Sequence, residues 1–201
     1  MRVYRPCCFF RCLYPDALFR IKTHEKNLYL TLDDGPDPES TPELLDILNN
    51  NDVKALFFCN GRAAEKFPEL VIKIRETGHL VGNHGYSHLN GWRTSQDKYC
   101  EDVNRASLLT SGNLFRPPYG RLTINQYKEL RKSFTIFFWD IMPYDFDRSF
   151  GAERSLNVLN KKLRPGSIIV LHDTSSSICR TFLKDFIDKS IGEGYKFELG
   201  L

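Results

Sequence analysis

The chain has 201 residues, of which 41% are hydrophobic and 13% aromatic, and its 28 basic and 25 acidic residues give a net charge of +3. This composition is typical of one globular domain with a substantial core and excludes a disordered chain. Because the charges are nearly balanced and no run of Lys and Arg occurs, we expect no nucleic-acid partner.

The start of the chain is basic and aromatic. Its longest apolar run, Cys7 to Phe10, has four residues, whereas a secretory signal needs ~7–15. We therefore expect no signal peptide, no transmembrane segment and a cytoplasmic protein, in which residues 1–26 form an arm packed on the domain. Contact of this arm with a membrane surface is the alternative. Without a signal sequence, the six cysteines are expected to be reduced thiols.

Apolar and amphipathic segments alternate along the rest of the chain. We expect strands over residues 28–32, 53–59, 80–82, 114–115, 134–139, 167–171 and 195–201. We expect helices over residues 42–50 (with Thr41 as cap), 68–77, 95–111, 123–132, 155–163 and 179–190. This alternation predicts a parallel α/β architecture, in which residues just past the strand ends build the site. The polar and aromatic residues at those ends are Asp33, Asp34, Arg116, Trp139, Asp140 and His172.

Two short segments carry candidate metal ligands. Asp33 and Asp34 follow an apolar strand, and His84 and His88 are four residues apart, one turn if that segment is helical. Asp34 with the two histidines would form a ligand set that leaves positions open for water and substrate. Zinc is the metal we expect, and cobalt, nickel or manganese would also fit nitrogen and oxygen ligands. Two unrelated imidazoles on a surface loop are the alternative.

Asp33 is the spare carboxylate of this pair. Neighbouring side chains on a strand diverge, so Asp33 can approach a water from another side than Asp34. The alternative is a turn residue, because Asp is common before Gly-Pro.

Two further strand ends carry residues suited to acyl transfer. Arg116 could pair with Asp33, and the prolines that follow Arg116 restrict the loop, so the Tyr119 backbone N–H could be aimed at an oxyanion. His172 ends an apolar strand, where it could donate a proton to a leaving nitrogen. Asp145 is the candidate to orient it. A proline-rich turn and a structural histidine are the alternatives.

Together these motifs resemble the polysaccharide deacetylase family (NodB-homology domain, carbohydrate esterase family 4) over residues 27–201. Thr31–Pro36 is similar to T-F-D-D-G-P, His84–His88 to H-[ST]-x-x-H, Arg116–Tyr119 to R-x-P-[YFW], and Leu171-His172 to L-H. Several motifs in the right order are more specific than any one of them.

The resemblance implies a distorted, incomplete (β/α) barrel of the seven-stranded type in a single domain, 27–201. It implies Asp33 as catalytic base held by Arg116, Asp34, His84 and His88 as metal ligands, His172 as catalytic acid oriented by Asp145, and Pro118, Tyr119, Phe146 and Leu171 around the oxyanion and acetyl group. The fourth motif departs from D-x-x-D-W, because Met142 replaces the first Asp and Phe146 the Trp.

The sequence therefore predicts a metal-dependent hydrolase that removes N-acetyl groups from a chitooligosaccharide- or peptidoglycan-like glycan and releases acetate. An O-acetyl esterase or a non-sugar amidase with the same site is the first alternative. An inactive glycan-binding module is the second, and Met142 and Phe146 are its only support.

Overall fold

The computed structural model describes residues 3–110 and 112–199. At its centre is a parallel sheet of seven strands with the order β5-β4-β3-β2-β1-β6, and β7 pairs with the start of β1. The strands are β1 (Asn27–Asp33), β2 (Leu56–Cys59), β3 (Leu80–Asn83), β4 (Leu114–Phe115), β5 (Thr135–Ile136), β6 (Ile168–His172) and β7 (Lys196–Phe197).

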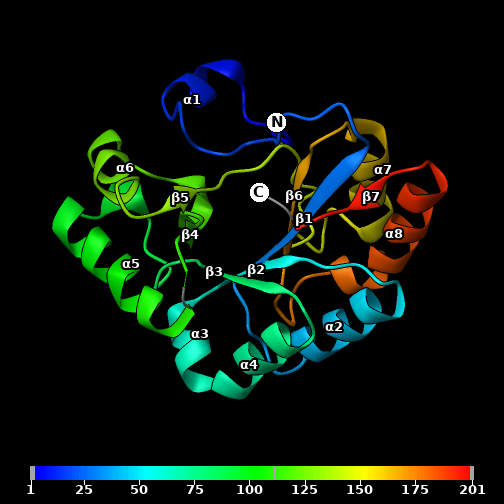
Figure 1. Ribbon diagram of the computed structural model, residues 1–201, viewed down its shortest axis with the longest axis horizontal. Helices are drawn as coiled ribbons and strands as arrows, with labels where there is room; N and C mark the ends of the chain where they lie inside the picture. The colour runs from blue at the N-terminus through cyan, green and yellow to red at the C-terminus, as the bar shows by residue number, and fades with distance from the viewer. Residues whose placement is uncertain (1–2, 111, 200–201) are drawn as a thin grey trace.

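The helices lie around this curled sheet, the first one over its open side and the later ones along its outer side (Figure 1). They are α1 (Cys8–Cys12), α2 (Ser40–Asn50), α3 (Gly61–Lys66), α4 (Pro68–Glu76), α5 (Gln96–Thr110), α6 (Ile124–Leu130), α7 (Ala152–Lys162) and α8 (Leu183–Gly192), with short 3₁₀ helices η1 (Gly91–Arg93), η2 (Pro118–Gly120) and η3 (Cys179–Thr181). After β5 the chain turns back to β6 through a single bridge between Ile141 and Ile169. The parallel α/β architecture predicted from the sequence is confirmed, and the barrel is incomplete, as the family resemblance implied.

The sheet is buried on both faces, as parallel sheets are. In β1, Leu28, Leu30 and Leu32 pack in the largest apolar cluster, whereas Tyr29 belongs to a second cluster on the other face. This packing fixes the register of β1 against β6, in which Asp33 and His172 are paired positions. The carboxyl ends of the central strands therefore meet at one edge.

Several predicted elements differ in the structure. The segment 134–139 keeps only two residues in regular pairing, because Phe137 bridges to Leu18 of the arm and the Phe138 N–H donates to the Leu18 carbonyl. Thr41 lies inside α2, where its hydroxyl donates to Asp173 (2.6 Å) instead of capping the helix. Sequence patterns also missed α1 and α3. The expected ends of two elements, at Ser111 and Leu201, lie outside the described residues.

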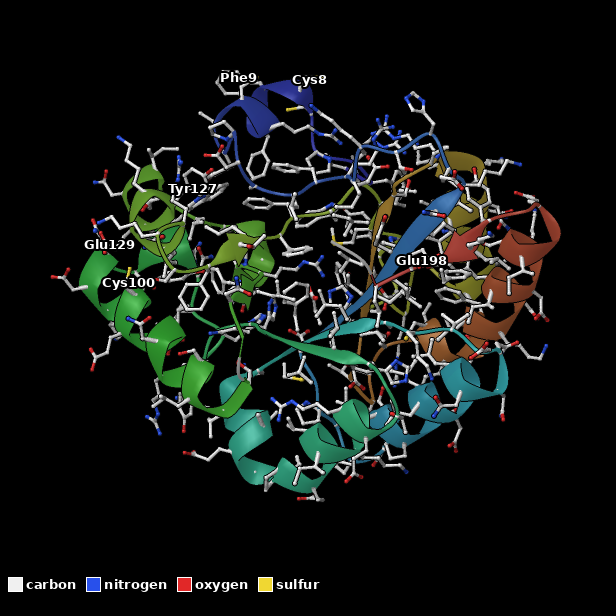
Figure 2. All side chains as sticks on the ribbon, viewed as in Figure 1. Cys8, Phe9, Cys100, Tyr127, Glu129 and Glu198 are labelled. Carbon is white, nitrogen blue, oxygen red and sulfur yellow. The ribbon has the colours of Figure 1, made fainter. Side chains whose placement is uncertain are left out.

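The N-terminal arm lies across one side of the barrel (Figure 1). Leu18 bridges to Phe137, and Phe10 packs on Tyr14, Phe19 and Phe138. Figure 2 shows Cys8 and Phe9 on the outer side of α1, where both are exposed. No helix of the described part of the chain is long and apolar enough to cross a membrane.

Candidate active site

A pocket of about 360 Å³ opens at the carboxyl edge of the sheet. It collects residues from four strand ends that are far apart in the sequence. Its lining residues include Asp33, Asp34, His84, His88, Arg116, Tyr119, Trp139, Met142, Phe146 and His172. The sequence-based expectation that the strand-end residues share one site therefore holds for this set.

Three of these residues present ligand atoms to one point. Oδ1 of Asp34 lies 3.4 Å from Nε2 of His84 and 3.1 Å from Nε2 of His88, and one ligand atom from each residue lies within 4.8 Å of the others. Ligands about 2.0–2.2 Å from one zinc ion are roughly 3.3 Å apart in a tetrahedral site. The spacing therefore fits a single metal ion.

The hydrogen bonding of these atoms also fits a metal. Asp34 Oδ1 is buried, yet no hydrogen bond of normal geometry reaches it from the described residues. Nδ1 of His84 lies 2.8 Å from the carbonyl oxygen of Arg116; if this nitrogen carries the proton, the lone pair of Nε2 faces Asp34. Burial would raise the pKa of Asp34, but the two imidazoles outweigh it and hold this pKa well below its usual range.

The two histidines are brought together by a loop and not by a helix. His84 follows β3 directly, and the backbone turns through positive φ at Gly85 (73°) and His88 (54°). Asn83 Oδ1 accepts the Gly85 N–H, and the Asp102 carboxylate accepts the N–H groups of Tyr86 and Ser87. Residues other than glycine rarely adopt positive φ, so the backbone at His88 is strained. The hydrogen bonds to Asn83 and Asp102 hold the loop in the conformation in which both imidazoles face Asp34.

Asp33 and Asp34 diverge, as expected for neighbours on a strand. Asp34 itself has φ of 79° and leaves the strand path. Nη1 of the buried Arg116 donates to Asp33 Oδ1 (2.7 Å) and to Thr31 (2.6 Å), and Nη2 donates to the Phe138 carbonyl (2.9 Å). Asp33 Oδ2 is left facing the ligand cluster, 4.0 Å from Nε2 of His84. This free oxygen can accept a proton from a water in the pocket.

The loop after Arg116 exposes one backbone donor. Tyr119 has φ of 59°, and its N–H makes no hydrogen bond to any residue of the described ranges. Pro117 and Pro118 restrict the backbone just before it. The ring of Tyr119 packs on His88, with centroids 4.5 Å apart. This ring contact holds Tyr119 beside His88 in the pocket wall.

His172, which also lines the pocket, is held by a buried carboxylate. Asp145 Oδ1 lies 2.9 Å from Nδ1 of His172, and Oδ2 accepts the His172 N–H (2.8 Å) and the Ser177 hydroxyl (2.7 Å). Burial would lower the pKa of His172, but the charge and hydrogen bond of Asp145, with Asp34 and Asp33, raise it to about 9. His172 is thus a cation near neutral pH and can donate a proton from Nε2.

Comparison with known proteins agrees with this arrangement. A sequence model of the family described as polysaccharide deacetylase matches residues 20–134. The chain belongs to the polysaccharide deacetylase family. The family predicted from the motifs is therefore confirmed.

Relatives of the family cover much of the chain. A peptidoglycan-N-acetylglucosamine deacetylase of Bacillus cereus is 38% identical over 72% of this chain, which spans 55% of that protein's length. A chitooligosaccharide deacetylase of Azorhizobium caulinodans is 32% identical over 77% of each protein. The crystal structure of a peptidoglycan N-acetylglucosamine deacetylase superposes with a TM-score of 0.84 at 33% identity, covering 90% of this chain and 88% of that one.

The departures from the family's fourth motif lie in the pocket wall. Met142 lines the pocket, and the ring of Phe146 packs edge-on to His172 with centroids 4.9 Å apart. Leu171 is fully buried in the core, and its neighbour Val170 lines the pocket instead. Pro118 is also buried, beside the pocket residues Pro117 and Tyr119.

Asp140 does not join the candidate active site. Its carboxylate is fully buried and pairs with Arg5 (3.1 Å), Arg11 (3.1 Å) and Arg164, and it accepts from Ser167. It therefore ties the N-terminal arm to the barrel. The sequence placed it at a strand end but could not show which way its side chain would turn.

Motif analysis also missed a residue that positions the segment carrying Asp33 and Asp34. Asp173 is buried under Gly35, and a Cβ built on Gly35 would lie 2.1 Å from its Oδ2. Its backbone N–H donates to the Asp33 carbonyl (2.7 Å). Burial raises the pKa of Asp173 to about 7, against the hydrogen bond from Thr41. The only signal in the sequence was its position directly after His172.

Proposed function

We propose that this chain is a metal-dependent hydrolase that removes N-acetyl groups from an N-acetylated glycan and releases acetate. The observation that carries the proposal is the placement of Asp33 and His172 at paired positions of β1 and β6, beside the ligand cluster. Neighbouring strands are about 4.8 Å apart. A proton acceptor and a proton donor therefore flank the place where an acetamide would lie.

The site would take zinc, with cobalt, nickel or manganese as alternatives, held by Asp34, His84 and His88. A bound divalent ion would polarise the acetyl carbonyl and lower the pKa of a water toward ~7. Asp33 accepts the proton of the attacking water, and Arg116 fixes the orientation of its carboxylate. The Tyr119 N–H donates to the developing oxyanion.

His172 completes the reaction by protonating the leaving nitrogen. An amine leaves poorly as an anion, so amide cleavage needs a general acid. The raised pKa of His172 keeps this proton available near neutral pH. Asp145 keeps the ring oriented so that Nε2, and not Nδ1, faces the substrate.

The glycan class is supported by the relatives, which are named for deacetylation of peptidoglycan and of chitooligosaccharides. The pocket wall contains two aromatic side chains, Trp139 and Phe146. Aromatic rings suit packing against the apolar face of a sugar ring. Location in the cytoplasm stays a prediction.

Comparison of an amide with an ester tests the proposal against an O-acetyl esterase. Acetate release is measured from a tetramer of N-acetylglucosamine and from an acetylated xylose oligomer, for the zinc-loaded protein and for His172→Ala. We expect His172→Ala to lose ~10²–10⁴-fold on the amide and clearly less on the ester, because an alkoxide leaves more easily. Turnover of the ester alone by the unmodified protein would favour the esterase.

A further inference from the structure

A second pocket of about 310 Å³ adjoins the candidate active site. The two share a wall of Tyr119, Gly120, Arg121, Trp139 and Met142. Its opposite wall comes from the N-terminal arm and consists of Val3, Pro6, Cys7 and Phe10. A ligand that fills both pockets would extend from the metal ligands to the arm.

The arm wall is held firmly in place. Arg5 and Arg11 both reach the buried carboxylate of Asp140, directly after the pocket residue Trp139. Met142 N–H donates to the Tyr4 carbonyl (3.0 Å), and the Val3 N–H donates to the Tyr144 hydroxyl (2.9 Å). The second pocket is therefore a built feature of the fold and not a gap beside a loose terminus.

The open side of this pocket presents aromatic faces. Trp92 and Tyr119 are each 58% exposed although they are large rings. Trp92 is fixed by a hydrogen bond from Nε1 to the Leu122 carbonyl (3.3 Å) and by the close approach of Gly91 to the Arg121 carbonyl, where a Cβ would lie 2.3 Å from that oxygen. Rigid, exposed rings of this kind suit the apolar face of a pyranose.

Arg121 adds a positive charge between these rings. Its guanidinium carbon lies 5.1 Å from the Trp92 centroid and 5.9 Å from the Tyr119 centroid. No carboxylate of the described residues forms an ion pair with it, and no acidic side chain from that part of the chain lines the second pocket. A guanidinium with no carboxylate partner suits a ligand that brings its own anion.

We propose that this second pocket, the arm pocket, binds a sugar unit next to the one that is deacetylated, and that Arg121 selects a unit with an acidic substituent, a carboxylate or a phosphate. The inference rests on the proposed function only in that the neighbouring sugar unit is taken to be the one deacetylated. Binding in the arm pocket is itself measurable without turnover. The arm thereby becomes part of the substrate-binding surface.

The chain contains two tryptophans, Trp92 and Trp139. Trp92 lines the arm pocket and Trp139 lines both pockets, so intrinsic fluorescence reports a ligand bound in the joined pockets. Three disaccharides are titrated into the zinc-loaded protein: neutral N,N′-diacetylchitobiose, its 1-phosphate, and N-acetylglucosaminyl-N-acetylmuramic acid with a free lactyl carboxylate. The variants are Arg121→Gln and, as a matched control, Arg154→Gln on α7, which is exposed and outside both pockets.

We expect at least one acidic disaccharide to bind about tenfold more tightly than the neutral one, since hydrogen bonds to charged groups are the stronger ones. Arg121→Gln should abolish this preference, whereas Arg154→Gln should keep it. Which acidic ligand binds more tightly identifies the substituent. Equal affinities for all three ligands, an unchanged fluorescence, or a preference that survives Arg121→Gln would each overturn the inference, whether or not acetate is released.

Discussion

The orientation and charge of His172 depend on one buried side chain, and Asp145→Asn tests this dependence. The substitution keeps the shape of Asp145 but removes the charge that raises the pKa of His172 to about 9. Burial then lowers the pKa of His172 without the opposing charge of Asp145, so this pKa should fall to its ordinary value of ~6.5 or below. Activity that needs protonated His172 is lost as pH rises through that value.

The size of the effect follows from the two pKa values. At pH 8 a group of pKa about 9 is ~90% protonated, whereas one of pKa ~6.5 is ~3% protonated, a difference of about 30-fold. At pH 6 both are mostly protonated. We therefore expect Asp145→Asn to lose about 30-fold in kcat at pH 8 and to recover most of it at pH 6.

The assay is acetate release from an N-acetylglucosamine tetramer between pH 5.5 and 9.5, with the zinc-loaded protein. Asp46→Asn, at an exposed position of α2, is the matched control and should leave the profile unchanged. Thermal melting shows whether Asp145→Asn is folded. An equal loss at pH 6 and pH 8 in a folded variant would show that Asp145 does not act through the protonation of His172.

Two further substitutions test the packing that supports the site. Arg116→Met leaves the buried Asp33 carboxylate without its partner and should lower the free energy of unfolding by about 3–5 kcal/mol in urea, whereas Arg154→Met should change it by less than ~0.5; equal effects would contradict the pairing. Gly35→Ala places a Cβ 2.1 Å from Asp173 Oδ2 and should cost ~1–3 kcal/mol. The double variant Gly35→Ala/Asp173→Ala should recover the stability lost in Gly35→Ala. A double variant that is no more stable than Gly35→Ala would place the strain elsewhere.

The sequence predicted the parts of the site that come from strand ends. Asp33, Arg116 and His172 each follow or end an apolar run, and parallel strands bring such positions to one edge. The ligand trio was predicted as well, although not its geometry. His84 and His88 meet through a loop with positive φ and not through a helix. A four-residue spacing allows both, and the loop conformation is explained by its contacts with Asn83 and Asp102.

The remaining features depend on contacts between distant segments. Asp140 was predicted at the same edge as the site, but three arginines, two of them from the arm, turn it away from the pocket. The strand expected over residues 134–139 is shortened because Phe137 and Phe138 pair with Leu18 of the arm. No local pattern specifies such pairings, so the sequence predicted the arm itself but not its contacts or the pocket that it forms with the barrel.

The proposed reaction depends on a metal ion held by Asp34, His84 and His88. The most direct measurement is acetate release from an N-acetylglucosamine tetramer by chelated protein, before and after zinc is added, for the unmodified chain, Asp34→Ala and the control Asp46→Ala. We expect zinc to restore turnover in the unmodified chain and the control but not in Asp34→Ala. Full activity of the chelated protein, or of Asp34→Ala, would show that deacetylation does not depend on a metal held by these residues.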